Sequence, residues 1–285
     1  NYLMKLKNSI IDPLGRYIIE DLNWIKLEKK WGLAEFPVVI SGKGSPLLCL
    51  HGFDSSFLEF RRIYPLLKKN FKLIIPDLLG FGFSPRITGT YYSPDNIIAN
   101  LIDLLSELKI TKKFNVLGAS MGGSAALSLT KEIYEDVNKI ILLSPAGLFE
   151  KPKNIPRPFN HMGAAFLGLP FIRKSLCRQA FAFPDKSVGV QEEQIASLHL
   201  GCKGWRNSLA CFARSGGFGG TYKDSKIIKT KTICGENDRI LGPQELSKIK
   251  KIKNLNFVKL KNCGHLPHLD LPQLTEKIIV DFLLE

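Results

Sequence analysis

Short apolar runs alternate along the chain with longer segments in which apolar residues recur at helical spacing. Short apolar runs bounded by turn residues predict strands, and longer periodic segments predict amphipathic helices. On this basis eight strands are predicted, at residues 24–30, 37–41, 47–50, 72–76, 114–117, 139–143, 230–234 and 256–259. Helices are predicted at residues 58–69, 94–108, 121–133, 243–250 and 271–284. The alternation predicts an α/β fold, in which helices cover both faces of a mostly parallel eight-stranded sheet.

One region interrupts the alternation. Residues 147–222 show no strand pattern, and contain proline-rich segments, apolar helical stretches near 162–178 and 192–211, and a glycine-rich end. The sequence therefore predicts a core made of residues 1–146 and 223–285, with a helical cap, residues 147–222, inserted between the sixth and seventh strands.

A candidate nucleophile follows the fifth predicted strand. Residues 114–123 read F-N-V-L-G-A-S-M-G-G, in which a strand leads into G-x-S-x-G and then into a helix. Glycines on both sides of Ser120 permit a tight turn that lifts the hydroxyl out of the sheet. The amino end of the following helix favours negative charge, so an oxyanion formed beside Ser120 is stabilised.

A hydroxyl at neutral pH needs a base to accept its proton. His265 lies in a sharp loop, C-G-H-L-P, just beyond the eighth predicted strand, where its side chain can reach across the carboxyl edge of the sheet. His268, three residues later, is the main alternative. The sequence favours His265 as the base.

A carboxylate is expected to orient the imidazole and stabilise its protonated form. Asp238 lies in G-E-N-D-R, directly after the seventh predicted strand, and Glu236 of the same loop is the alternative. Asp238 is the predicted acid.

The turn after the third predicted strand reads H-G-F-D, residues 51–54. Its Gly52 lets the backbone approach closely, so the N–H groups of Phe53 and Met121 are the predicted oxyanion hole. His51 is expected to brace this loop. Asp54 is either a turn residue or part of the substrate pocket.

These motifs together resemble the α/β-hydrolase superfamily, and in particular its capped esterases, lipases and proline-iminopeptidase-like enzymes. The matching segments are H-G-F at 51–53, P-D-L-L-G-F-G-F-S at 76–84, G-A-S-M-G-G at 118–123, G-E-N-D-R at 235–239 and C-G-H at 263–265. The resemblance implies that Ser120, Asp238 and His265 form a catalytic triad under the cap. The segments at 51–56 and 76–82 are also similar to hydrolases of photosynthetic organisms.

Differences from the resembled groups narrow the expected chemistry. Dehalogenases and epoxide hydrolases of this superfamily carry Asp at the position of Ser120, and dehalogenases follow it with Trp, where this chain has Met121. Many carbon–carbon bond hydrolases have Trp at the position of Leu266. These differences favour hydrolysis of an ester, thioester or amide by a serine nucleophile, with no metal or cofactor. Together with the apolar cap described next, they favour a serine hydrolase that cleaves a hydrophobic carboxylic ester through an acyl-enzyme. One alternative is a perhydrolase or carbon–carbon hydrolase with the same triad. Another is a binding receptor that retains the hydrolase fold but has little catalytic activity.

The apolar side chains of the cap suggest the substrate pocket. Most of them are expected to form the cap's own core, because an inserted helical segment must bury apolar surface. Some should line an apolar pocket over the nucleophile. Phe166, Phe171 and Trp205 are the candidates, together with Asp54 and with Leu266, the residue after the predicted base.

A formal net charge of +14 comes from 40 basic and 26 acidic residues. Lysines outnumber arginines and are scattered, whereas nucleic-acid binders cluster basic residues and rely on arginine. We therefore expect a lysine-rich solvated surface, no nucleic-acid partner, and a monomer or homodimer. A weak contact with an anionic membrane is the alternative, since residues 2–11 combine helical apolar spacing with Lys5 and Lys7. A helix that docks on the body of the protein gives the same pattern and is favoured.

The six cysteines show neither C-x-x-C pairs nor metal-ligand spacing, so free thiols in a reducing compartment are expected. Residues 1–10 lack the order of a signal peptide, and no apolar run approaches the roughly 18–20 residues of a membrane-spanning helix. The expected location is the cytoplasm or the interior of an organelle, without secretion.

Overall fold

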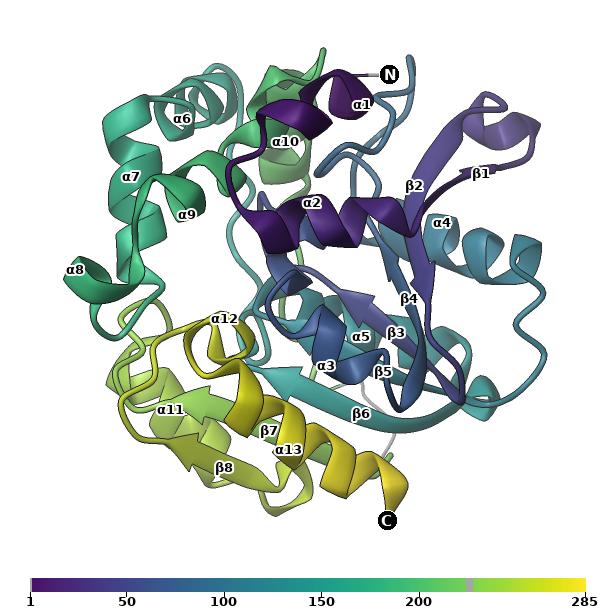
Figure 1. Ribbon diagram of the computed structural model, residues 1–285. Coiled ribbons are helices and arrows are strands. Elements are labelled where there is room, and N and C mark those ends of the chain that lie inside the picture. Colours follow the sequence, from purple (N-terminus) through teal and green to yellow (C-terminus); the bar gives the residue numbers. More distant parts are fainter. Residues whose placement is uncertain (1, 224–227) are drawn as a thin grey trace.

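A computed structural model describes residues 2–223 and 228–285; residues 1 and 224–227, which fall within the predicted core ranges, lie outside the described part. A single twisted sheet runs through the middle of the molecule (Figure 1). Its strands are β1 (Leu22–Lys26), β2 (Glu35–Ser41), β3 (Ser45–Leu50), β4 (Phe71–Pro76), β5 (Phe114–Ala119), β6 (Val137–Leu143), β7 (Thr230–Gly235) and β8 (Phe257–Leu260).

The strand order is β1-β2-β4-β3-β5-β6-β7-β8. β2 is antiparallel to β1 and β4, and the pairs from β4 onward are parallel. The predicted mostly parallel eight-stranded sheet is therefore confirmed. β1 ends earlier than predicted, because residues Lys29–Trp31 form a 3-10 turn that Gly32 closes with a φ of 68°.

Helices cover both faces of the sheet. One face carries α4 (Pro94–Glu107), α5 (Met121–Glu132) and α11 (Gly242–Lys250), and the other carries α2 (Pro13–Glu20), α3 (Tyr64–Leu67) and α13 (Pro272–Leu284). Strand β3 shows why both faces are apolar. Leu48 and Leu50 pack into the first core, while Leu47 and Cys49 pack into the second. Alternate side chains of a strand point to opposite faces, so a strand buried on both sides is apolar throughout.

The amino-terminal segment docks on the body of the protein. Helix α1 (Tyr2–Leu6) buries Leu3, and Ile10 is buried in the same core. Asp12 then begins α2, where its carboxylate accepts hydrogen bonds from the N–H groups of Leu14 and Gly15 and Pro13 occupies the first turn. The favoured interpretation of residues 2–11, a helix packed on the protein, agrees with this burial.

The region between β6 and β7 is helical, and we call it the helical insertion. It contains α6 (Phe159–Leu167), α7 (Pro170–Gln179), α8 (Pro184–Ser187), α9 (Val190–Ile195) and α10 (Trp205–Ser215). Figure 1 shows α6 to α9 to one side of the sheet, beyond its carboxyl edge. The predicted helical stretch at 162–178 is two helices, because the chain turns at Gly168 and restarts at Pro170. A Cβ on Gly168 would lie 3.0 Å from the Trp205 ring, so this turn packs closely on α10.

Short helices connect the remaining elements. The predicted helix at 58–69 is a 3-10 turn, Phe57–Phe60, followed by α3, whose second residue is Pro65. Helix α12 (Pro267–Asp270) leads into α13. Within residues 2–223 and 228–285, no helix combines the length and the apolar character that crossing a bilayer requires.

Candidate active site

Ser120 occupies a strained turn between β5 and α5. Its φ of 52° lies in the left-handed region, which side-chain-bearing residues rarely adopt. The turn is held by hydrogen bonds from Ser120 N to the Leu143 carbonyl at 2.8 Å and from Gly123 N to the Ser120 carbonyl at 2.9 Å. A Cβ on Gly118 would lie 2.2 Å from the Gly122 carbonyl oxygen. A side chain at Gly118 would therefore clash with the backbone, which explains why glycine is required beside Ser120.

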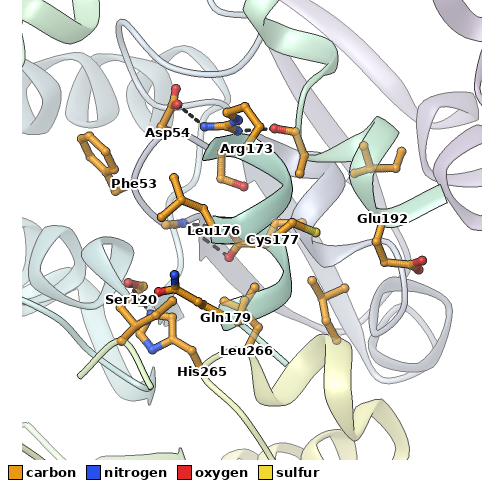
Figure 2. Close-up of a pocket in the computed structure, with 18 of the residues that line it drawn as sticks. Phe53, Asp54, Ser120, Arg173, Leu176, Cys177, Gln179, Glu192, His265 and Leu266 are labelled. Atoms are coloured by element: carbon orange, nitrogen blue, oxygen red, sulfur yellow. Dashed lines mark hydrogen bonds and ion pairs between the residues drawn. The ribbon is translucent and has the colours of Figure 1, made fainter. Parts of the chain in front are cut away.

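His265, which follows β8, reaches Ser120, and Asp238, which follows the neighbouring strand β7, reaches His265. His265 Nε2 lies 2.8 Å from Ser120 Oγ, and His265 Nδ1 lies 2.8 Å from Asp238 Oδ2. Because an ionised carboxylate only accepts hydrogen bonds, Nδ1 donates to Asp238 and Nε2 is left to accept the serine proton. The structure thus brings the three predicted residues into one continuous hydrogen-bond chain (Figure 2, which labels Ser120 and His265).

Asp238 is buried and is held in its charged form. Its second carboxylate oxygen accepts hydrogen bonds from the N–H groups of Ile240 at 2.9 Å and Leu241 at 3.0 Å. Burial alone would raise the pKa of Asp238. The hydrogen bond and electrostatic interaction with His265, together with the two backbone donors, outweigh burial and hold this pKa below its ordinary value. The carboxylate is therefore available to stabilise an imidazolium.

The two alternative residues lie elsewhere. Glu236 is exposed and pairs with Lys259 at 2.8 Å. His268 is buried, with its ring stacked on Phe60 and its Nε2 atom 3.3 Å from Glu59. Neither side chain is hydrogen-bonded to Ser120 or Asp238 within the described residues.

The turn after β3 lies beside the serine. A Cβ on Gly52 would be 3.3 Å from Ser120 Cβ, which places the predicted oxyanion residue Phe53 next to the nucleophile. The buried carboxylate of Glu59 accepts the N–H of Gly52 at 3.2 Å. His51 braces the same loop as expected: its Nδ1 donates to the Gly52 carbonyl at 2.8 Å and its Nε2 accepts the N–H of Leu78 at 3.0 Å.

Met121, the second predicted oxyanion donor, is the first residue of α5. The switch point of an open α/β sheet, where successive connections leave in opposite directions, is a common site for ligands. β3 and β5 flank that point here, and Phe53 and Met121 follow them.

Asp54 is the centre of a buried cluster that joins this loop to the helical insertion. It adopts a φ of 47°, and its carboxylate accepts hydrogen bonds from Arg173 at 2.6 Å and from Trp205 Nε1 at 2.8 Å, with His199 Nε2 at 3.0 Å. Burial alone would raise the pKa of Asp54, but His199, Arg173 and Trp205 lower it below its ordinary value. A buried charge is stable only with such partners.

The loop that carries His265 is also tied to the insertion. His265 N donates to the Ala180 carbonyl at 2.8 Å, just after α7. One oxygen of Asp270 accepts the N–H groups of Gly264 at 2.7 Å and Ala182 at 2.8 Å. The insertion is therefore bonded to both the predicted oxyanion loop and the histidine loop.

A cavity of about 410 Å³ lies between the insertion and the carboxyl edge of the sheet. Ser120 and His265 line its floor, and Leu176 and Gln179 of α7 lie over them (Figure 2). Apolar residues make up much of the wall: Phe53, Leu167, Leu176, Ala180, Phe181, Ile195, Ile240, Leu266 and Leu269.

Most charged side chains in the wall have a charged partner. Glu192 of α9 binds Arg62 and lies 3.5 Å from Arg61 Nη2, and Arg61 Nε donates to Asp12 at 2.5 Å. Together with the pair of Asp54 and Arg173, these contacts neutralise most of the charge of the wall. Arg239 also lines the cavity, but its guanidinium donates only to the backbone carbonyls of Phe181 and Ala182.

The predicted pocket residues divide into three groups. Asp54 and Leu266 line the cavity. Trp205 is buried and acts as a partner of Asp54. Phe166 and Phe171 are 52% and 65% exposed, and neither is among the described residues that line the cavity. The structure thus differs from the expectation for both phenylalanines, because α6 and the start of α7 turn these side chains to solvent.

Sequence reasoning missed Arg173, His199 and Glu59, which hold the loop beside the nucleophile. Arg173 and His199 are 119 and 145 positions from their partner Asp54, so no local spacing marks them. Glu59 is only seven residues from its partner Gly52, but no motif marks that pair.

All six cysteines are free. In the part of the chain that the structure describes, no group of three or more His, Cys, Asp or Glu side chains is arranged to hold a metal ion.

The alpha/beta hydrolase family model matches residues 47–277. The chain belongs to the alpha/beta hydrolase family. Among curated relatives, it is 29% identical to the alpha/beta hydrolase domain-containing protein VTE7 of Arabidopsis thaliana, over 99% of this chain and 89% of the relative. This similarity agrees with the expected likeness to hydrolases of photosynthetic organisms.

Other relatives carry the names of enzymes. The chain is 33% identical to 2-hydroxymuconate semialdehyde hydrolase of Pseudomonas sp. (strain CF600), over 86% of this chain and 89% of the relative. It is 32% identical to lipase 3 of Moraxella sp. (strain TA144), over 80% of this chain and 73% of the relative. The family match and the topology of the sheet together confirm the predicted α/β-hydrolase fold. The similarity to named hydrolases and lipases supports hydrolase activity.

Proposed function

We propose that this protein is a serine hydrolase that cleaves hydrophobic carboxylic esters through an acyl-enzyme on Ser120. The observation that carries the proposal is the chain from Ser120 Oγ to His265 Nε2 and from His265 Nδ1 to Asp238, with both distances at 2.8 Å. Nucleophile, base and orienting acid within hydrogen-bond reach are the geometry that acyl transfer requires.

In the first half of the reaction, His265 takes the hydroxyl proton as Ser120 attacks the ester carbonyl. The carbonyl oxygen becomes an oxyanion, which the N–H groups of Phe53 and Met121 stabilise. The tetrahedral species collapses when the C–O bond breaks, and His265 gives its proton to the departing alcohol. In the second half, His265 accepts a proton from water, the hydroxide attacks the acyl-enzyme, and Ser120 leaves with the returned proton.

The substrate class follows from the cavity. Its wall above Ser120 is largely apolar, and its charged residues other than Arg239 have charged partners, so it offers few contacts to a charged acyl group. A neutral ester with an apolar acyl or alcohol part would bury that surface favourably, at about 25 cal/mol per Å² of apolar area. The lipase relative supports this class.

The insertion contributes to the same proposal as a cap. Its contacts with the loops of Asp54 and His265 make it a fixed roof over the nucleophile, and it supplies Leu167, Leu176 and Ala180 to the wall. A roof of this kind excludes water from the oxyanion, which strengthens each hydrogen bond to it.

A series of p-nitrophenyl esters from acetate to laurate tests the ester proposal. We expect kcat/KM to rise with acyl length until the cavity is filled, and Ser120→Ala to lower it by about 10⁴-fold or more. Equal rates for all chain lengths would contradict the hydrophobic ester, and an active Ser120→Ala variant would contradict the serine mechanism.

Carbon–carbon bond hydrolysis is the second candidate, since the relative at 33% identity is named as a hydrolase of 2-hydroxymuconate semialdehyde. Assaying that compound beside the esters separates the two reactions. If 2-hydroxymuconate semialdehyde were turned over much faster than every ester, carbon–carbon bond hydrolysis would be favoured over ester hydrolysis.

A further inference from the structure

One face of helix α6 is apolar and exposed. Phe159, Met162 and Phe166 follow one another at spacings of three and four residues and are 60%, 61% and 52% exposed. Phe171, at the start of α7, is 65% exposed. We group Phe171 with the three residues of α6 and call these four residues the α6 face. Large apolar side chains gathered on one exposed helix face indicate an interaction site rather than chance exposure.

The opposite side of α6 packs against α10. Ala164 is buried against α10, and the Asn160 side chain donates to the Ala210 carbonyl at 2.9 Å. Turning the helix to bury the α6 face would remove this hydrogen bond and expose the buried side. A Cβ on Gly163 would meet no atom within 4 Å, which agrees with an open face.

The surroundings of the α6 face are positively charged. Between residues 151 and 190 the chain has seven Lys or Arg residues, of which Arg173, Lys174 and Arg178 pair with Asp54, Glu193 and Asp185. Lys151, Lys153 and Arg157 lie in the exposed segment that leads into α6. An apolar face beside basic residues fits the headgroup region of an anionic bilayer, where apolar side chains insert and Lys or Arg contact phosphates.

The α6 face is adjacent along the chain to residues that line the cavity, since Leu167 directly follows Phe166. Helix α7 carries Phe171 in its first turn and the cavity-lining Leu176 one turn and a half later. Leu176, Phe53 and Ile240 line the cavity and are each more than a third exposed, so its rim is apolar. α6 and α7 lie together on the same side of the molecule, away from the carboxyl-terminal end of α13 (Figure 1).

We propose that the α6 face docks on the surface of a membrane that contains anionic phospholipid, with the rim of the cavity turned toward the bilayer. Phe159, Met162, Phe166 and Phe171 enter the headgroup region, and Lys151, Lys153 and Arg157 contact lipid phosphates. The surface is distinct from the segment of residues 2–11, in which Leu3 and Ile10 are buried.

Vesicle co-sedimentation tests the proposal without any turnover, since ether-linked lipids contain no carboxylic ester. The wild-type chain is mixed with ether-linked phosphatidylcholine vesicles, either pure or with one third ether-linked phosphatidylglycerol. We expect binding to the mixed vesicles, weaker binding to the neutral ones, and loss of binding as salt is raised. The result is independent of the ester proposal.

Matched variants locate the binding surface. The triple variant Phe159→Ser, Met162→Ser, Phe166→Ser should lower the vesicle affinity at least about tenfold. A control with serine at Leu33, Leu274 and Leu284, which are exposed elsewhere, should bind like the wild type. Lys151→Glu with Lys153→Glu should also weaken binding, whereas the same change at Lys112 and Lys113, before β5, should not.

Three results would overturn the proposal. The first is a wild-type chain that does not bind the mixed vesicles, and the second is a triple α6-face variant that binds them as tightly as the wild type. The third is a dimer in light scattering that the same variant dissociates, since a second copy of the chain would then cover the face.

Discussion

Arg173 Nη1 donates a 2.6 Å hydrogen bond to Asp54 Oδ2, although the two residues are 119 positions apart in the chain. Asp54 directly follows Phe53, the predicted oxyanion donor, and Arg173 belongs to helix α7 of the insertion. The insertion therefore fixes the backbone beside the nucleophile as well as covering it. Catalysis by this protein should depend on the insertion even where its residues touch no substrate.

Arg173→Ala tests this dependence. Without Arg173, Asp54 keeps His199 and Trp205 but loses its closest charged partner, and the turn at φ 47° is held less firmly. A misplaced oxyanion donor weakens binding of the transition state more than binding of the ester. We therefore expect kcat to fall about tenfold to a hundredfold with a smaller change in KM.

Lys174→Ala is the matched control for Arg173→Ala, because Lys174 is the next residue of α7 and pairs on the surface with Glu193. Its steady-state kinetics should match the wild type. Unchanged kcat in Arg173→Ala, in a variant whose circular dichroism is native, would show that the contact of Asp54 with Arg173 serves the fold alone.

Asp238→Asn should lower kcat by about 10⁴-fold while the fold persists, because an amide can hold His265 in the wrong tautomer and cannot stabilise the imidazolium. Glu236→Gln, two residues earlier on the same loop, is exposed and should retain nearly full activity. Steady-state kinetics of the two variants check the assignment. Comparable losses of kcat in the two variants would contradict the assignment of Asp238 as the orienting acid.

Gly122→Ala should destabilise the protein by about 3 kcal/mol or more, because the new Cβ would lie 2.1 Å from the Leu50 carbonyl oxygen and the backbone cannot yield. Gly163→Ala, on the open face of α6, should instead add roughly 0.5–1 kcal/mol to stability through the better helix propensity of alanine. Urea unfolding measures both changes. A Gly122→Ala variant as stable as the wild type would show that the turn at Ser120 is looser than its geometry implies.

Asp12 links the stability of the protein to pH. Burial would raise the pKa of Asp12, but the hydrogen bond and charge of Arg61 and the N–H groups of Leu14 and Gly15 hold it below its ordinary value of 3.8. A carboxylate with a lowered folded pKa adds stability above pH 3.8, and this contribution is lost as the pH falls through the folded pKa.

Asp12→Asn keeps a capping oxygen on α2 but loses the ion pair with Arg61. Its Tm should lie below that of the wild type at neutral pH, and the difference should shrink as the pH falls below 3.8. Calorimetry over this range measures the difference. A gap in Tm that stays constant with pH would mean that the ion pair does not account for it.

The strands, Ser120, Asp238 and His265 could be predicted from the sequence because each depends on local pattern. A strand buried on both faces is apolar throughout, and a residue just after a parallel strand lies at the carboxyl edge of the sheet. The three side chains follow β5, β7 and β8, so their meeting point was set by the order of the strands.

The contacts of the insertion could not be predicted in the same way. Asp54 finds Arg173, His199 and Trp205 only once the insertion is folded over the sheet, and nothing in the spacing of these residues records that approach. Phe166 and Phe171 were expected in the pocket because they are apolar. The exposure of Phe166 depends on which side of α6 packs against α10, and that of Phe171 on how the start of α7 is turned. The apolar composition of these segments leaves both choices open.

Labelling with a fluorophosphonate probe tests the central claim most directly, because the probe reacts with a serine only when a neighbouring base activates the hydroxyl. Intact-mass spectrometry followed by peptide mapping should show one probe per chain, attached to Ser120, and no labelling in Ser120→Ala or His265→Ala. Absence of labelling in the active wild-type chain, or labelling that persists in Ser120→Ala, would contradict the proposed mechanism.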